Sequence, residues 1–415
     1  MNLLPLDVVE GCANLPGVKH LAGFKTVVKL EHVMTKISTL VVRIACLVSA
    51  CGVLSWNAVF SAAESDPITI GAVLPLTGEA AHWGIPAGTG AELAVHEINA
   101  AGGIRGRSLA LVVEDDRCNP AEGVLAFNAI MASAKPPVAV LGAVCSGVTL
   151  ALAPLVQSRK VVLISPASTS PKLTGAGDFI FRVVPSGSVR GQVFAEYLYR
   201  DRGLRKLAVL YINNEGGIGG STAFKARFTQ LGGTVAIELP YAQGTTDLRA
   251  QLNEIKTANT EGVLVGSYPP DTVAVLQQAR EFQLEQPLFF TTEAVQNPEV
   301  LRQAGDAAEG ATYILAAPAA GEAIERFTAA YELKFKKKPE LFAAEGYDVV
   351  RLIAEAIAGT TAESLSGSGI RDFLRRVRDY AGASGTITFD GNGDVIKPYA
   401  IKRIEGGNPK TILVR

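Results

Sequence analysis

Short apolar runs alternate with helical patterns from residue 68 onward, and this alternation constrains the fold more than any other feature. Ile68–Leu74 is a continuous apolar run typical of a buried strand. From Ala91 to Ile98 the apolar residues then recur at the i, i+3, i+4, i+7 spacing of a helix. The cycle repeats, with further strands expected near Leu109–Val113, Val138–Leu141 and Val161–Ile164. Because strands that alternate with helices form mostly parallel sheets, the sequence predicts an α/β fold with doubly wound sheets.

The same pattern restarts after Pro185, which predicts a second α/β lobe that begins near residue 186. A chain of 415 residues is long enough for two cores, because single cores rarely grow beyond roughly 250–300 residues. Near the end, Thr386–Phe389 and Tyr399–Arg403 are expected to form a hairpin that turns at 390–393. Two similar lobes without a long flexible linker predict a ligand cleft between them that opens and closes.

The first 66 residues differ in pattern from the rest of the chain. From Met34 a basic start is followed by a long uncharged apolar stretch and by small residues at 61–63, which together are typical of a secretory signal. We expect Met34 to be the true start, 34–63 to be the cleaved signal and 1–33 to be an upstream artefact, so that the protein works in the periplasm. A membrane anchor and lipid attachment at Cys51 are the alternatives.

Cysteine usage agrees with an oxidising compartment. Three of the five cysteines lie in the expected leader, so only Cys118 and Cys145 remain in the mature chain. Each ends an apolar run, at the carboxyl edge of the expected sheet, where the polar residues Ser146 and Thr169 should also lie. A disulfide between the two cysteines is the simplest interpretation, and two buried thiols are the alternative.

Charge and motifs exclude several classes of function. The formal net charge of -1 argues against nucleic acid or an anionic membrane as the main partner. The sequence contains no hydrolase or phosphate-loop motif and no His/Cys cluster with metal-ligand spacing. The glycines at 216–220 follow a strand but lack the spacing of a dinucleotide loop. We therefore expect no enzyme activity, no cofactor and no metal, and a small molecule as the ligand.

A few side chains at the ends of strands are candidates for ligand binding. The hydroxyls of Ser146 and Thr169 lie where helix N-termini favour a carboxylate, although ordinary helix capping would also explain them. Glu293 follows a strand of the second lobe and could hold an ammonium group, with a solvated loop glutamate as the alternative. Trp83 and Tyr268 follow strands too, and either wall an apolar pocket or simply pack their loops.

Several longer segments are specific enough to indicate a family. The words INAAGGIRG, GAVCSGVTLALAP, VVLISPASTSP and GDAAEGATYILAAP resemble the type I periplasmic binding proteins of bacterial ABC transporters, and most closely those for branched-chain amino acids. The resemblance runs from about Ile68 to Lys402. It implies two lobes joined by three crossings, with lobe 1 formed by 67–185 and 317–380 and lobe 2 by 186–316 and 381–415.

The resemblance also implies roles for individual residues. Ser146 matches the serine that binds the ligand carboxylate, and Glu293 matches the acidic residue that binds the α-ammonium group. Gly216 departs from the family, because a tyrosine usually stands there, and its absence should enlarge the pocket. The pair Cys118–Cys145 matches a disulfide of the leucine/isoleucine/valine subgroup. The complete expected binding set is Trp83, Ser146, Ala167, Ser168, Thr169, Gly216, Tyr268, Glu293 and Phe342.

These observations predict a monomeric solute-binding protein that captures an aliphatic or other hydrophobic amino acid and delivers it to a membrane permease. Ser146 and Thr169 would hold the carboxylate, Glu293 the ammonium group, and the three aromatic residues the side chain. The alternative within the same fold is a binding protein or sensor for amides, urea or small aromatic or carboxylic acids.

Overall fold

The structure, a computed structural model, describes residues 66–360 and 366–415. The predictions for the leader, including the start at Met34 and lipid attachment at Cys51, lie outside the described residues. The described residues belong to one compact unit, Ser65–Arg415. None of the helices in the described ranges is long and apolar enough to cross a membrane.

The first lobe is built on a five-stranded sheet in which all neighbouring strands are parallel, in the order β2-β1-β3-β4-β5. These strands are β1 (Ile68–Leu74), β2 (Leu109–Asp115), β3 (Ala139–Gly142), β4 (Val162–Ser165) and β5 (Ile180–Arg182). The connections contain the helices α2 (Ala81–Ala100), α3 (Pro120–Met131) and α4 (Ser146–Arg159) and the 3₁₀ turn η1 (Pro171–Leu173). Strands β1, β3 and β4 are buried along their whole length, as expected for a sheet covered by helices on both faces.

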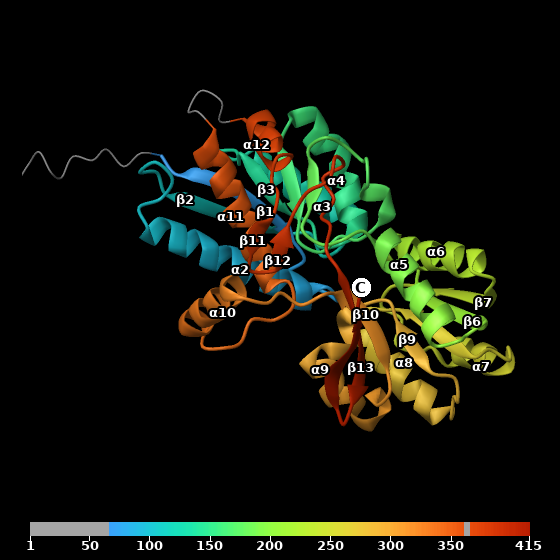
Figure 1. Cartoon of the computed structure of the whole chain (residues 1–415). Helices are drawn as coiled ribbons and strands as arrows, with labels where there is room; N and C mark the ends of the chain where they lie inside the picture. The colour runs from blue at the N-terminus through green and yellow to red at the C-terminus, as the bar shows by residue number, and fades with distance from the viewer. Residues whose placement is uncertain (1–65, 361–365) are drawn as a thin grey trace, which may run out of the picture. The chain divides into compact units, whose positions relative to one another are not determined.

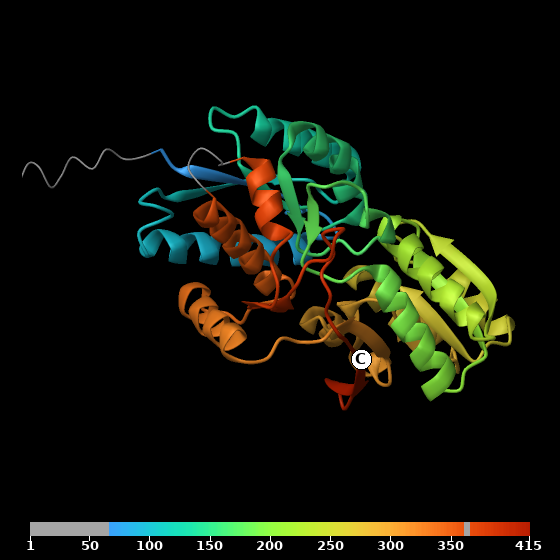
Figure 2. The same ribbon diagram turned by 45° about the horizontal axis from the view of Figure 1, so that its top comes forward.

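A later segment of the chain returns to this lobe. It contains the helices α10 (Glu322–Phe335), α11 (Ala343–Gly359) and α12 (Gly367–Leu374) and the short paired strands β11 (Tyr380–Gly382) and β12 (Gly385–Ile387). Figures 1 and 2 show α11 beside α2. The two helices approach so closely because Gly90 and Gly346 lie at their contact, where an added Cβ would stand 1.8 Å and 2.0 Å from backbone oxygens of the other helix. This packing places the N-terminal ends of α2 and α11 in one lobe.

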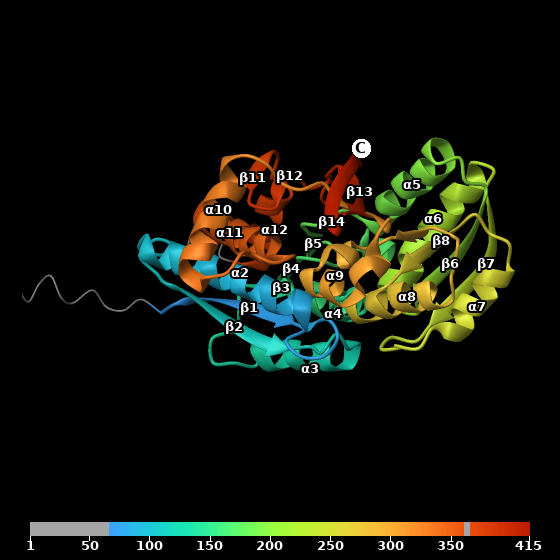
Figure 3. The same ribbon diagram turned by 90° about the horizontal axis from the view of Figure 1, so that it is seen from below.

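The second lobe has a seven-stranded sheet in the order β14-β13-β10-β9-β8-β6-β7. Its strands are β6 (Lys206–Ile212), β7 (Thr234–Tyr241), β8 (Gly262–Gly266), β9 (Leu288–Phe290), β10 (Thr312–Ala316), β13 (Tyr399–Glu405) and β14 (Asn408–Val414). Strands β6 to β10 are parallel to one another, whereas β13 pairs antiparallel with β10 and with β14. The helical elements are α5 (Gly187–Glu196), η2 (Tyr197–Asp201), α6 (Glu215–Gln230), α7 (Arg249–Thr257), α8 (Pro269–Glu281), η3 (Glu293–Gln296), α9 (Pro298–Ala304) and η4 (Gly305–Ala308). Figure 3 shows these elements together on one side of the unit, with the first lobe on the other.

The C-terminal region corrects two expectations. The predicted hairpin between Thr386–Phe389 and Tyr399–Arg403 is wrong, because β12 pairs with β11 and β13 pairs with β10 and β14. In addition, Ile387, Phe389 and Val395 pack in the core of the first lobe. We therefore move the expected boundary after residue 380 to about residue 396, just before β13 enters the second lobe.

Candidate functional site

One pocket lies between the two lobes and receives side chains from both. It contains about 540 Å³ of space, including open solvent at its mouth. The first lobe contributes Trp83, Val144, Ser146, Ala167, Thr169 and Phe342. The second lobe contributes Arg190, Ile212, Gly216, Gly217, Gly266, Ser267, Tyr268, Thr291, Thr292 and Glu293. Eight of the nine expected binding residues thus line this pocket.

The strand ends explain why these residues meet. Ser146 begins the helix that follows β3, and Thr169 lies in the loop after β4. In the second lobe, Tyr268 precedes α8 after strand β8, and Glu293 begins η3 after strand β9. Parallel strands bring such loops to one edge of each sheet, so both lobes present their carboxyl edges to the pocket.

The hydroxyl of Ser146 is arranged to donate a hydrogen bond. Its Oγ accepts the backbone N–H of Thr169 at 3.2 Å and that of Ser170 at 3.1 Å. A hydroxyl oxygen has two lone pairs, and both are used by these contacts. What remains is the O–H, which suits an acceptor such as a carboxylate oxygen.

Thr169 has a cationic neighbour that the sequence did not indicate. Its Oγ1 accepts a hydrogen bond from Nη2 of Arg190 at 3.1 Å, which leaves the threonine O–H able to donate. Ser146, Thr169 and the Arg190 guanidinium together form an end of the pocket that favours an anion.

Glu293 lies beside the same arginine. Its Oε2 is 3.6 Å from Nη1 of Arg190, and the side chains of Arg190 and Glu293 are only 10% and 12% exposed. Burial raises the pKa of the Glu293 carboxyl above its ordinary value, and the positive charge of Arg190 opposes that rise. The two residues therefore form a buried ion pair within the pocket wall.

Aromatic rings from both lobes cover the remaining wall. The ring of Trp83 meets that of Tyr268 edge-on at a centroid distance of 4.6 Å, and that of Phe342 at 6.0 Å. The Tyr268 hydroxyl accepts a hydrogen bond from Nδ2 of Asn214 at 3.1 Å, which fixes the ring from the second lobe. These contacts form an apolar surface with the edge-to-face geometry that aromatic pairs prefer.

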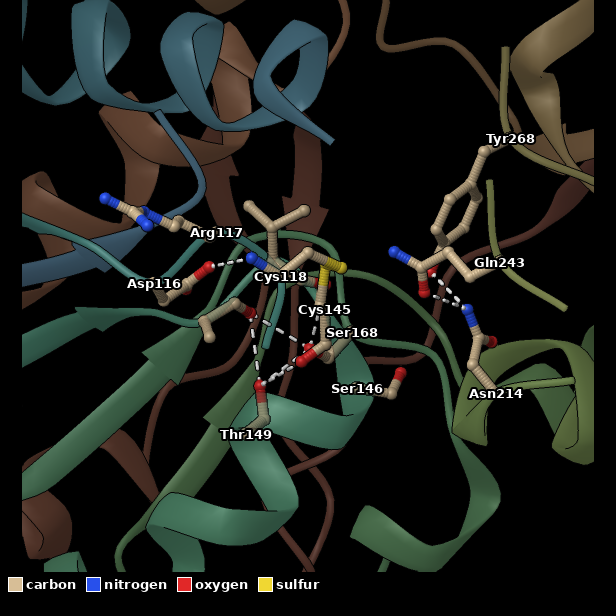
Figure 4. Close-up of a disulfide and its surroundings, with 12 residues drawn as sticks. Asp116, Arg117, Cys118, Cys145, Ser146, Thr149, Ser168, Asn214, Gln243 and Tyr268 are labelled. Atoms are coloured by element: carbon tan, nitrogen blue, oxygen red, sulfur yellow. Dashed lines mark hydrogen bonds between the residues drawn. A yellow bond between two sulfur atoms is a disulfide. The ribbon is translucent and has the colours of Figure 1, made fainter. Parts of the chain in front are cut away.

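Ser168 does not line the pocket, in contrast to the other expected binding residues. Its side chain is fully buried in the first lobe, where its hydroxyl bonds Thr149 Oγ1 at 2.7 Å and the carbonyl oxygens of Ala143 at 2.9 Å and Val144 at 3.0 Å. Figure 4 shows these bonds at the start of α4. Ser168 thus supports the loop that carries Thr169, because its hydroxyl attaches this loop to Thr149 and to the chain before α4.

Arg190 is the charged residue among the eight pocket residues that the sequence analysis missed. Its spacing could have predicted that Arg190 is buried. Arg190, Phe194 and Tyr197 are separated by four and three residues, and they share the buried face of the helix. A charged residue on a buried helix face needs a partner. The identity of that partner, Glu293, is not visible in the sequence, since the two residues are far apart along the chain.

Gly216 lies at the first turn of α6 and faces the pocket. An added Cβ at this position would stand 3.6 Å from Asn214 Oδ1 and 3.9 Å from Ser146 Oγ, both ordinary contacts. A side chain here would therefore extend toward Ser146 from the second lobe. Without a side chain at this position, α6 contributes only backbone here, and an enlarged pocket relative to the family stays a prediction.

The two cysteines of the first lobe lie next to the pocket. The sulfur atoms of Cys118 and Cys145 are bonded, and their Cα atoms are 5.4 Å apart, an ordinary spacing for a disulfide. Cys145 directly precedes Ser146, so the bond attaches the start of α4 to the loop after β2. Figure 4 shows Ser146 beside the disulfide, with Asn214, Gln243 and Tyr268 of the second lobe opposite.

Metal ligands are not clustered in this region. No group of three or more His, Cys, Asp or Glu side chains that could hold a metal occurs among residues 66–360 and 366–415. The pocket chemistry is that of hydrogen-bond donors, one ion pair and aromatic rings.

Known proteins share both the sequence pattern and the fold. The chain is 31% identical over 348 residues to the Leu/Ile/Val-binding protein homolog 3 of Brucella melitensis, an alignment that covers 82% of this chain and 91% of that protein. The structure of the leucine-binding protein LivK of Thermotoga maritima matches with a TM-score of 0.77 and 28% identity, over 84% of this chain and 98% of that one.

A further solved structure, the branched-chain amino acid substrate-binding protein LivJ of Streptococcus pneumoniae in complex with isoleucine, matches with a TM-score of 0.75 and 26% identity. It covers 84% of this chain and 99% of that one. The family model described as periplasmic binding protein matches residues 67–408. The chain therefore belongs to the periplasmic binding protein family, whose members are solute-binding proteins of the type I fold and not enzymes.

Proposed function

We propose that this protein captures a hydrophobic amino acid in the periplasm and delivers it, as a monomer, to the permease of an ABC transporter. The observation that carries the proposal is the pocket itself, which brings Ser146, Thr169 and Glu293 together from two lobes. The names of the relatives support it, since they describe Leu/Ile/Val-binding and leucine-binding proteins.

The two ends of the pocket suit the two charges of an amino acid. The hydroxyls of Ser146 and Thr169 would donate to the carboxylate, and Glu293 would accept from the α-ammonium group. A buried zwitterion needs a partner for each charge, because an unpaired buried charge is costly. Ala167 would add its backbone beside the carboxylate, while the rings of Trp83, Tyr268 and Phe342 would enclose the apolar side chain.

Closure of the lobes would couple binding to delivery. Trp83 comes from the first lobe and Tyr268 from the second, and Lys172 and Glu215 form an ion pair of 2.9 Å between the same lobes. A ligand that contacts both sides favours the closed form by the difference between its affinities for the two forms. The closed protein would present a joint surface of both lobes to the permease.

The replacement Ser146→Ala tests the carboxylate end. Leucine at one hundred times its dissociation constant should stabilise the wild-type protein by about 2.7 kcal/mol, a rise that thermal unfolding detects. The alanine variant loses a hydrogen bond to a charged group, worth about 1.5–3 kcal/mol, so its affinity should fall at least tenfold. We would measure both proteins by thermal unfolding and calorimetry after removal of bound ligand.

The matched control is Ser158→Ala, because Ser158 is an exposed serine of the same helix. This control should bind leucine like the wild type. Equal leucine affinity in the Ser146→Ala and Ser158→Ala proteins would contradict the assigned role of Ser146. A panel of the twenty amino acids, amides and aromatic acids in the same assay identifies the preferred ligand.

The replacement Glu293→Gln tests the ammonium end. It removes the negative charge but leaves the Arg190 guanidinium in place, so an α-ammonium group would face a positive charge without compensation. Leucine affinity should fall by at least about tenfold in calorimetry. Glu254→Gln is the control, since Glu254 is exposed on α7. Unchanged affinity in the Glu293 variant would remove Glu293 from the binding site.

A further inference from the structure

Arg190 lies in a position that the amino-acid proposal alone does not explain. It belongs to α5, directly after the first crossing between the lobes, and only 8% of the residue is exposed. It lines the ligand pocket and also a second cavity, which lies beside the segments that cross between the lobes. Thr169 and Glu293 line both spaces as well. A guanidinium therefore stands between the two groups expected to hold the opposite ends of an amino acid.

The contacts of Arg190 leave part of its hydrogen-bonding capacity unused. Nη2 donates to Thr169 Oγ1 at 3.1 Å, and Nη1 lies 3.6 Å from Glu293 Oε2, close enough for an ion pair. Within the part of the chain that the structure describes, its Nε is buried and has no hydrogen-bond partner. A buried donor without a partner carries a desolvation cost, so the Arg190 guanidinium is held in the pocket wall without a full set of hydrogen bonds.

The charge of Arg190 affects the two ends of an amino acid in opposite ways. It attracts a carboxylate held at Ser146 and Thr169, because the guanidinium already contacts Thr169. It repels an ammonium group at Glu293, because the guanidinium already accompanies that carboxylate. A carboxylic acid without an ammonium group would gain the attraction and avoid the repulsion.

We propose that Arg190 sets the ligand class of the pocket: its ion pair with Glu293 allows a hydrophobic carboxylic acid that lacks an α-ammonium group to bind beside Ser146 and Thr169. This inference rests on the proposed function, since it uses the same carboxylate end and the same apolar wall. It identifies Arg190 as a specificity-determining residue and widens the ligand class from amino acids to hydrophobic monocarboxylates.

A matched pair of ligands separates the two charges. Leucine and 4-methylpentanoate share one carbon skeleton and one carboxylate, and differ only in the α-ammonium group. The replacement Arg190→Gln keeps a polar side chain for Thr169 but removes the charge. In this variant both ligands lose the attraction between their carboxylate and the guanidinium. Only leucine also loses a repulsion, the one between its ammonium group and the guanidinium. In addition, Glu293 loses its cationic partner, which the ammonium group of leucine can replace and the acid cannot.

The experiment is calorimetry of the full chain, as purified from the expressing cells and stripped of ligand, with both compounds at neutral pH. We expect the wild type to bind 4-methylpentanoate measurably. Arg190→Gln should shift the ratio of the two affinities by at least about tenfold in favour of leucine. Glu293→Gln should shift the same ratio in the opposite direction, because it removes the group that attracts ammonium and repels a second carboxylate.

Two further variants serve as controls for the charge of Arg190. Arg202→Gln removes an exposed arginine of the same lobe and should leave the ratio unchanged. Arg190→Lys retains the charge and should bind the acid better than Arg190→Gln does, with thermal unfolding to show that each variant is folded. Failure of the wild type to bind the acid, or a shift below tenfold with Arg190→Gln, would overturn the inference. If leucine still binds and depends on Ser146, the proposed function stands without it, whereas binding of neither ligand contradicts both.

Discussion

The replacement Asp394→Ala is expected to lower the free energy of unfolding by about 3–5 kcal/mol, because it leaves a buried arginine without its counter-charge. Nε and Nη2 of Arg182 bond the two carboxylate oxygens of Asp394 at 2.6 Å and 2.8 Å. The Arg182 side chain is 2% exposed and that of Asp394 12%. Urea unfolding of the wild type and the variant measures the difference.

The same pair also supports the ligand pocket. Arg182 ends β5, just before the first crossing, and Asp394 lies just before the third. Nη1 of Arg182 donates to the carbonyl oxygen of Ser170 at 2.9 Å, in the loop that carries Thr169. Asp394→Ala should therefore weaken leucine binding as well, since this loop loses part of its support.

An exposed ion pair is the matched control for this experiment. Arg371 and Asp372 form a contact of 2.7 Å, but the Asp372 side chain is 50% exposed. Asp372→Ala should change the stability by less than about 1 kcal/mol. The double replacement Arg182→Met/Asp394→Leu should recover much of the loss, because no unpaired buried charge remains. Similar losses for Asp394→Ala and Asp372→Ala would show that burial adds nothing to the Arg182–Asp394 pair.

The double replacement Cys118→Ser/Cys145→Ser is expected to cost about 3–4 kcal/mol of stability in the chain-entropy model. The two residues are separated by 27 positions, so their bond restricts a loop of the unfolded chain that contains α3 and β3. Thermal and urea unfolding in the absence and presence of a reductant measure the effect. Leucine affinity should fall too, because Cys145 holds the residue next to Ser146.

The reductant supplies the control for the disulfide. It should destabilise the wild-type protein by about the same amount as the double replacement, and it should have no effect on the variant. A wild-type protein that is equally stable with and without reductant would indicate that Cys118 and Cys145 are buried thiols, the alternative considered from the sequence.

Much of the fold follows from local sequence patterns. Continuous apolar runs such as Ile68–Leu74 predicted the buried parallel strands, because a strand covered on both faces needs apolar residues at every position. The prediction of a C-terminal hairpin was wrong because local patterns do not determine which strands pair. Thr386–Phe389 and Tyr399–Arg403 each have the composition of a strand. The strands with which they pair depend on packing between distant segments: the first pairs with β11, and the second pairs with β10 and β14.

The pocket residues, too, could be predicted only in part from the sequence. Ser146, Thr169, Tyr268 and Glu293 could be placed from the sequence, because each follows a strand whose carboxyl end must lie at the edge of a parallel sheet. The orientation of a side chain within its loop could not be placed in this way. Ser168 turns into the first lobe instead of the pocket, because the carbonyl oxygens of Ala143 and Val144 accept its hydroxyl there.

By itself, the sequence determined the α/β architecture with its two lobes, the family, and the strand ends that carry most of the pocket residues. The architecture and the strand ends depend on periodicity and on neighbours a few positions away, whereas the family was indicated by the resemblance of longer segments. Only the tertiary structure decided the partners of the buried charges, Arg190 with Glu293 and Arg182 with Asp394. The physical reason is that a buried charge requires a counter-charge in space and not in sequence, and the folding of the whole chain brings the two together.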